Sequence, residues 1–236
     1  MLRLIVVAVI LAGFVPSSRA GVAYTDGFEG PNLNPFWTPS ISRGSLSFTP
    51  AGAHSGTNGA QFDTTSDSSG QKTVQLTHAF GQPTFGNFSV WVYDTAAGEP
   101  STNYFRFFAS PTPVSANGWG AQILTHDEPP DPNYTVMGFT SNEIASTVAR
   151  TKGWHHWEID DQPTGLNLLI DGQTVLSSPN VQPISNVVLM MTAPGFRPGW
   201  TGYYDDFQFT PVPEPGTAGT IACIGALCAL RRRRWA

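Results

Sequence analysis

Short runs of apolar and polar residues alternate through the middle of the chain. Runs with a period of two, or continuous apolar runs, recur about every eight to twelve residues, and Gly, Pro, Ser, Thr and Asn separate them. This pattern predicts an all-β domain, a jelly-roll sandwich of two antiparallel sheets with about six strands each. The clearest runs are 73–80, 87–93, 103–109, 119–125, 134–140, 154–160, 166–170, 187–191 and 203–209.

Two of these runs also carry local detail. Asp171 and Gly172 separate the runs LNLLI and QTVLS, and Asp-Gly favours a two-residue hairpin turn because both residues adopt positive φ readily. In a strand over 154–160 the side chains point alternately to opposite faces. One face then receives Trp154, His156 and Glu158, and the other receives His155, Trp157 and Ile159.

The first 20 residues have the pattern of a secretory signal peptide. Arg3 precedes an apolar stretch over 4–15, and small residues lead to Ala20. The alternative is an N-terminal membrane anchor, but this apolar stretch is short for one. We therefore expect an exported protein whose mature chain begins at Gly21.

A second apolar stretch lies near the carboxyl end, over residues 217–230. As a helix its 14 residues would span only ~21 Å of a ~30 Å hydrocarbon layer. Prolines precede it and four arginines follow it, and a basic cluster stays on the cytoplasmic side of a membrane. The flanks therefore predict one short membrane crossing.

Three consecutive features make this tail similar to a PEP-CTERM sorting signal. They are the residues Val212, Pro213, Glu214, Pro215 and Gly216, the short apolar segment, and the terminal Arg231, Arg232, Arg233 and Arg234. The resemblance implies that exosortase, a membrane-embedded cysteine peptidase, processes the protein for the cell surface or the extracellular matrix. A simple single-pass anchor is the alternative. The chain thus divides into a signal peptide (1–20), a sandwich (21–211) and a sorting signal (212–236).

The net charge of the exported domain disfavours two classes of binding partner. It holds 16 of the 17 acidic residues but only six of the 12 Lys and Arg residues, so its formal charge is near −10. Nucleic acid and anionic membranes are poor partners for such a surface. Cys223 and Cys228 both lie in the tail, so the domain contains no disulfide.

The domain resembles the concanavalin A-like lectin/glucanase family, including its laminin G-like members, at three places. These are residues 26–30 (DGFEG), residues 153–159 (GWHHWEI) with 168–172 (LLIDG), and residues 203–207 (YYDDF). The resemblance implies a lectin-like sandwich. It also implies that His155 faces the interior as a hydrogen-bonded core residue.

Catalysis is not expected. Residues 158–163 (EIDDQP) are similar to the E-x-D-x-x-E signature of family 16 glycoside hydrolases, but Gln162 or Pro163 stands where the acid would be. A retaining glycosidase needs two carboxyl groups ~5 to 5.5 Å apart. Hydrolysis that uses Glu158 therefore remains only as an alternative.

A structural calcium ion is a further hypothesis. Asp26 and Glu29 near the first strand, with Asp205 and Asp206 near the last, offer four carboxylates that would clip the two strands together. Solvated carboxylates at a turn are the alternative interpretation. Asp127, Glu128 and Asp131 form another acidic loop, for which we expect ordinary solvated charge.

Tryptophan supplies the candidate ligand contacts, because aromatic faces stack on the apolar faces of sugar rings. Trp119 and Trp200 each follow a glycine and are the pair we expect to be exposed, although core packing is the alternative for each. The sequence thus predicts a non-catalytic module that binds an extracellular polysaccharide, or else a purely structural surface protein.

Overall fold

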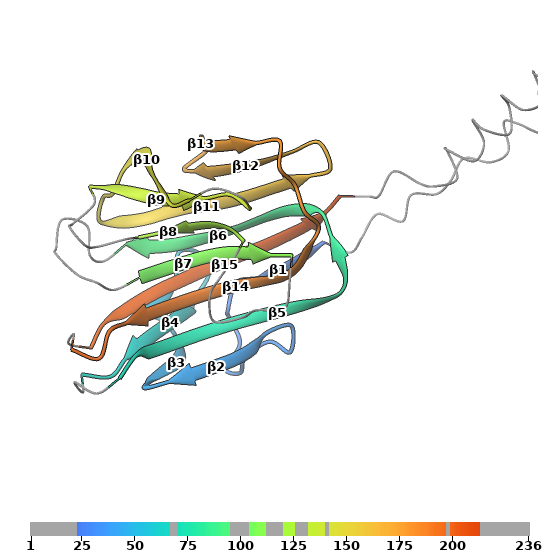
Figure 1. Cartoon of the computed structure of the whole chain (residues 1–236). Helices are drawn as coiled ribbons and strands as arrows, with labels where there is room; N and C mark the ends of the chain where they lie inside the picture. The colour runs from blue at the N-terminus through green and yellow to red at the C-terminus, as the bar shows by residue number, and fades with distance from the viewer. Residues whose placement is uncertain are drawn as a thin grey trace, which may run out of the picture. The chain divides into compact units, whose positions relative to one another are not determined.

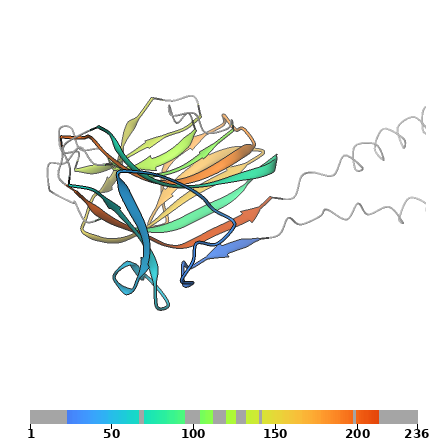
Figure 2. The same ribbon diagram turned by 90° about the horizontal axis from the view of Figure 1, so that it is seen from below.

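The computed structural model describes residues 23–66, 70–94, 104–111, 120–125, 132–139, 142–196 and 199–212. Residues Val22–Pro211 form one compact unit. Two antiparallel sheets and one short 3-10 turn, η1 (Pro50–Gly52), make up its described part. Figure 1 shows the two sheets, and Figure 2 shows them from below, stacked face to face. The prediction of an all-β sandwich is confirmed.

The first sheet has eight strands. Their spatial order is β13 (Gln173–Ser178), β12 (Gly165–Ile170), β11 (Gly153–Gln162), β6 (Gly86–Asp94), β15 (Thr201–Pro211), β4 (Gly59–Thr64) and β3 (Gly44–Thr49), and β1 (Tyr24–Asp26) also pairs with β15. The last strand of the chain therefore lies in the middle of this sheet, hydrogen-bonded to β6 and β4.

The second sheet has seven strands. Their spatial order is β10 (Ile144–Ala149), β9 (Asn133–Met137), β8 (Ala121–Leu124), β7 (Tyr104–Ser110), β14 (Ile184–Ala193), β5 (Lys72–Thr84) and β2 (Thr38–Ser42). The chain crosses repeatedly between the sheets, so strands distant in sequence become neighbours. β14, for example, pairs with both β5 and β7.

Alternating side chains build the core between the sheets. Along β11 the residues His155, Trp157 and Ile159 are buried, and the residues between them are half-buried. Leu189 and Phe107 enter the same core from the second sheet. Full burial of an apolar side chain stabilises the fold by about 1.5 to 3 kcal/mol. The two predicted faces of β11 are thus correct.

The predicted hairpin joins β12 to β13. Asp171 has φ of 50° and Gly172 has φ of 77°, the positive values that a tight hairpin turn requires. Asp171 is one of four described residues other than glycine with positive φ. An Asp-Gly pair fits here because both residues tolerate this backbone region.

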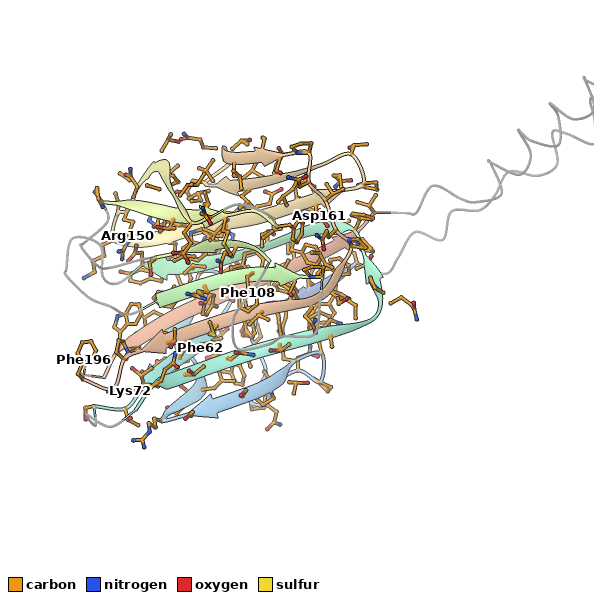
Figure 3. The ribbon with its side chains drawn as sticks, in the orientation of Figure 1. Phe62, Lys72, Phe108, Arg150, Asp161 and Phe196 are labelled. Carbon is orange, nitrogen blue, oxygen red and sulfur yellow. The ribbon has the colours of Figure 1, made fainter. Side chains whose placement is uncertain are left out.

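A buried ion pair fixes the connection between β10 and β11. Arg150 Nε and Nη2 donate to the two carboxylate oxygens of Asp94 at 3.0 and 3.1 Å, and its backbone N–H donates to Pro132 O at 2.7 Å. Figure 3 labels Arg150 at the left end of the sandwich. Such a bidentate contact joins the connection after β10 to the end of β6.

The predicted signal peptide (1–20) and residues 213–236 lie outside the described residues. Of the predicted sorting signal only Val212 is described, and it is half-buried. No helix in the described part of the chain is long and apolar enough to cross a membrane.

Candidate functional site

Aromatic side chains cover part of the outward surface of the first sheet. On β6 they occupy the positions that alternate with buried core residues, and the register places them beside outward residues of β11 and β15. One further ring comes from the loop before β4. We call this group the aromatic face, and its members are His54, Trp91, Tyr93, Trp154, His156 and Tyr203.

The rings of the aromatic face contact one another. His54 stacks on Trp91 with 3.8 Å between ring centroids, and its centroid lies 5.3 Å from that of Trp154 in an edge contact. Tyr93 makes edge contacts with Trp154 at 5.4 Å and with Tyr203 at 5.9 Å. All these side chains are half-buried. Mutual packing therefore restricts their rotation while part of each ring stays accessible.

Carboxylates of β15 hold the loop that carries His54. Asp205 Oδ2 accepts hydrogen bonds from the backbone N–H groups of His54 and Ser55 at 2.7 and 3.1 Å. Asp206 Oδ2 lies 2.8 Å from His54 Nδ1, and Ser55 Oγ donates to Asp206 Oδ1 at 2.8 Å. Burial raises the pKa of Asp205 to about 6, although the backbone N–H donors act to lower it. The loop is thereby fixed beside Trp91.

Polar side chains continue the same surface along β11. Glu158 and Asp160 follow His156 at successive outward positions, about 7 Å apart along the strand. Asn87 Nδ2 donates to Glu158 Oε1, and Gln162 Nε2 donates to Asp160 Oδ1 at 2.6 Å. We call Glu158 and Asp160 the acidic end of the aromatic face.

The outward surface of the second sheet has a different character. Its strands contain no Asp or Glu in the described ranges, and its outward positions include the buried apolar residues Phe108, Leu124 and Val188. Phe108 is labelled on β7 in Figure 3. Within the described strands, the carboxylates therefore lie on the first sheet, the same sheet that carries the aromatic face.

The carboxyl-terminal segment matches a known family model. Residues 211–234 match the family model described as the PEP-CTERM protein-sorting motif. The chain carries a PEP-CTERM sorting motif. This confirms the predicted sorting signal, and it implies export, a membrane-anchored stage before cleavage, and processing by exosortase. The PEP-CTERM match begins at Pro211, the residue at which β15 ends.

The sandwich in front of the PEP-CTERM motif is similar to solved structures of glycan-active proteins. A Crh5 transglycosylase in complex with NAG has a TM-score of 0.59 and 13% identity over 86% of this chain and 90% of that chain. A family 16 endo-glucanase from Bacteroides ovatus has a TM-score of 0.55 and 7% identity over 79% and 99%. A laminarinase from Flavobacterium sp. UMI-01 has a TM-score of 0.55 and 13% identity over 79% and 98%. At such identities the likeness shows the fold alone. No curated protein matches this sequence.

The four carboxylates predicted to hold calcium join distant segments, but through hydrogen bonds. Asp26 accepts from Trp37 Nε1 and from Phe28 N, each at 2.9 Å. Glu29 accepts from the backbone N–H groups of Thr57 and Asn58 at 2.8 and 3.1 Å. Asp205 and Asp206 hold the His54 loop. The described residues contain no group of three or more His, Cys, Asp or Glu side chains that could hold a metal ion. The structural calcium ion stays a prediction.

Of the two tryptophans predicted to contact glycan, only Trp200 lies among the described residues, and it is not part of the aromatic face. Trp119 lies outside the described residues. Trp200 is half-buried instead of exposed, and its ring centroid lies 4.6 Å from that of the buried Phe105. Trp200 therefore packs against the core with part of its side chain, and a contact with glycan stays a prediction for both tryptophans. The predicted acidic loop with Asp127, Glu128 and Asp131 also lies outside the described residues.

His155 is buried and hydrogen-bonded, as predicted. Its Nδ1 lies 2.7 Å from Asp171 Oδ2, and its Nε2 lies 2.8 Å from Thr151 O. Burial lowers the pKa of His155, but the bond to Asp171 and the other nearby groups outweigh burial and raise it above 6.5. This histidine therefore joins β11 to the hairpin turn and lies on the inner side of the sheet, away from the aromatic face.

Most residues of the aromatic face were not predicted as a ligand-contacting group. The alternation along 87–93 already separates Trp91 and Tyr93 from the core residues, and the same rule applies to Tyr203. These signals could have identified three of the rings. No local signal in the sequence marks His54, because its position depends on carboxylates about 150 residues later.

Proposed function

We propose that the protein is an exported, PEP-CTERM-sorted surface protein whose sandwich binds glycan through the aromatic face without catalysis. The aromatic face is the observation that carries this proposal. Half-exposed indole and phenol rings offer flat apolar surfaces to the apolar faces of sugar rings. Because Trp91 and Trp154 lie on neighbouring strands and contact the same imidazole, their orientation is set before a ligand arrives.

Polar groups that can bind sugar hydroxyls border the rings. Gln61 lies opposite Tyr203 in the register of β4 and β15, and its side chain donates to Asp63 Oδ2 at 2.8 Å. Asn87 and Glu158 flank the other end. Apolar rings beside a few placed polar groups are typical of small-molecule and glycan sites.

The carboxylates support binding better than hydrolysis. Glu158 and Asp160 lie on an outward strand surface, and each accepts a hydrogen bond from a neutral amide. The second sheet offers no carboxylate in its described strands that could act with them as the partner acid. Two outward carboxylates two residues apart are nevertheless what favours the second candidate, a glycoside hydrolase.

Retention on polysaccharides tests the proposal. The full chain, solubilised in neutral detergent, is passed over a panel of gel-embedded neutral, cationic and anionic polysaccharides. We expect retention on at least one polymer, and a loss of about tenfold in affinity for Trp154→Ala. Phe196→Ala is the matched control, because Phe196 is 69% exposed and lies on the connection between β14 and β15. Figure 3 labels it at one tip of the sandwich.

Two results would contradict the proposal. One is an absence of retention on every polymer, which would favour a purely structural protein. The other is an equal loss for Trp154→Ala and Phe196→Ala. Release of reducing sugar that Glu158→Gln abolishes would replace binding by the hydrolase alternative.

A further inference from the structure

Charge is divided unequally between the two sheets. The strands of the first sheet contain Asp26, Asp63, Asp94, Glu158, Asp160, Asp161, Asp205 and Asp206 and no Lys or Arg. The described strands of the second sheet contain Lys72 and Arg106 and no Asp or Glu. The sheet that carries the aromatic face therefore holds all the carboxylates of the described strands. Arg150 compensates the charge of Asp94, and the pKa values of Asp161 and Asp205 are raised to about 7 and about 6.

Part of this negative charge reaches the ligand-accessible side. Asp63, Glu158 and Asp160 occupy outward positions and are half-buried. Asp63 accepts hydrogen bonds from Gln61 Nε2 at 2.8 Å and from Thr201 Oγ1 at 2.5 Å. These donors are neutral, so they orient the carboxylate and leave its charge uncompensated.

The two carboxylates of the acidic end, like Asp63, accept hydrogen bonds from neutral donors. Glu158 Oε1 and Asp160 Oδ1 accept from amide side chains, while within the described residues no hydrogen bond reaches Glu158 Oε2 or Asp160 Oδ2. His156 lies at the preceding outward position of β11 and contacts Trp91 at 5.1 Å between centroids. Rings and ionised oxygens thus form one continuous strip along β11.

We propose that the ligand of this strip is a polysaccharide that carries free amino groups. The inference rests on the proposed function, because the sugar rings would lie on the aromatic face. Protonated amines of the same polymer pair with Glu158 and Asp160, which supply free oxygens and form no ion pair with a Lys or Arg among the described residues. An anionic glycan would meet like charge along the whole sheet, in a domain with a formal charge near −10. A neutral glycan would leave both free oxygens without a donor stronger than a hydroxyl.

Exposed ion pairs are individually weak, and salt screens them. Their contribution therefore appears as a dependence on ionic strength and on the amino content of the polymer. Contacts with the aromatic rings depend little on salt. Salt dependence therefore distinguishes binding by the acidic end from binding by the aromatic rings in one experiment.

The test compares polymers of one backbone. The full chain in neutral detergent is bound to chitosan, whose amines are free, and to chitin, whose amines are acetylated, with alginate as the anionic polymer. At about pH 5.5 sugar amines are protonated and ordinary carboxylates are ionised. We expect the strongest retention on chitosan, and a loss of at least about threefold between about 50 and about 500 mM NaCl.

Variants assign the effect to the acidic end. Glu158→Gln with Asp160→Asn should reduce retention on chitosan to the level seen on chitin and leave retention on chitin unchanged. Glu143→Gln is the control, because Glu143 is an exposed carboxylate just before β10, outside the first sheet. Both substitutions keep the size of the side chain, and the melting temperature of each variant reports whether it is folded.

The outcomes separate the two proposals. Equal retention on chitin and chitosan, insensitive to salt and to the paired substitution, would overturn the amino-glycan inference and leave glycan binding intact. Preference for alginate would overturn it as well. No retention on any polymer would overturn both. Retention on chitosan that Glu143→Gln reduces as much as the paired substitution would show general charge attraction and also contradict the inference.

Discussion

At the residue scale, Asp161 is a buried carboxyl group without a hydrogen-bond partner in the described core. It lies on the inner side of β11, it is 0% exposed, and neither carboxylate oxygen has a hydrogen-bond partner. Burial first, and the charge of Asp160 second, raise the pKa of Asp161 from 3.8 to about 7. Figure 3 labels it at the end of the sandwich opposite Arg150. The folded state therefore holds its proton more tightly than the unfolded chain does.

This raised pKa predicts a specific pH dependence. The stabilising effect of the bound proton is fully present below about pH 3.8 and is lost as the pH rises through about 7. Asp161→Asn removes the titration, so it should raise the free energy of unfolding at pH 8 by about 1 to 3 kcal/mol and change little at pH 4. Chemical denaturation at the two pH values measures this. A gain of equal size at both would contradict the assignment.

His155 predicts a second pH effect of the same sign. Its pKa is raised above 6.5, so its contribution to stability is complete below that pH and is lost as the pH rises through the folded-state pKa. Asp171→Asn removes the charge that favours protonation and keeps a residue that tolerates a φ of 50°. We expect the variant to be less stable than the wild type, by more at pH 5.5 than at pH 8.5. Thermal melts at both values test this.

At the element scale, the loop of residues 53–58 depends on β15. Asp206→Asn keeps the shape of the side chain but weakens its contacts with His54 Nδ1 and Ser55 Oγ. The expected cost in stability is about 0.5 to 1.5 kcal/mol. Retention on the preferred glycan should also weaken, because His54 would no longer be fixed against Trp91. Unchanged retention would show that fixing His54 against Trp91 does not contribute to glycan binding.

The strand β15 also contains a glycine at a position where the neighbouring Phe105 leaves no room for a side chain. A Cβ at Gly202 would lie 1.7 Å from Phe105 Cζ, a buried ring of the second sheet. Gly202→Ala should therefore destabilise the sandwich by about 1 to 3 kcal/mol through overpacking. Gly165→Ala is a control in the same sheet, because its nearest neighbour would be 3.6 Å away. Denaturant midpoints compare the two variants.

The strands themselves were predictable because a period of two is a local property. The alternation over 154–160 separated the two faces correctly, the family resemblance indicated which face is inward, and Asp-Gly predicted the turn. The contact of Trp200 with Phe105 could not be predicted from the preceding glycine, because Phe105 lies about 95 residues earlier. The aromatic face likewise depends on the register of β6 with β11 and β15. Contacts between distant strands determine which surface residues meet, and local patterns do not contain them.

At the scale of the whole molecule, the PEP-CTERM motif and the sandwich have separate tasks. Replacing Arg231, Arg232, Arg233 and Arg234 by Gln removes the basic cluster that keeps the carboxyl end on the cytoplasmic side. We expect the native host to accumulate unprocessed chain, with the sandwich still folded. Immunoblots of cell fractions report the size and location of the product. Normal processing of this variant would contradict the role assigned to the arginines.

The central position of β15 has a consequence for biogenesis. Until Thr201–Pro211 is present, β13, β12, β11 and β6 have no hydrogen-bonded connection to β4 and β3. Pairings across such sequence distances form late and slowly. We therefore expect the ribosome and the export machinery to handle a chain that lacks its closing strand, and the sandwich to mature only after β15, whose last residue is the first of the matched motif, has been exported.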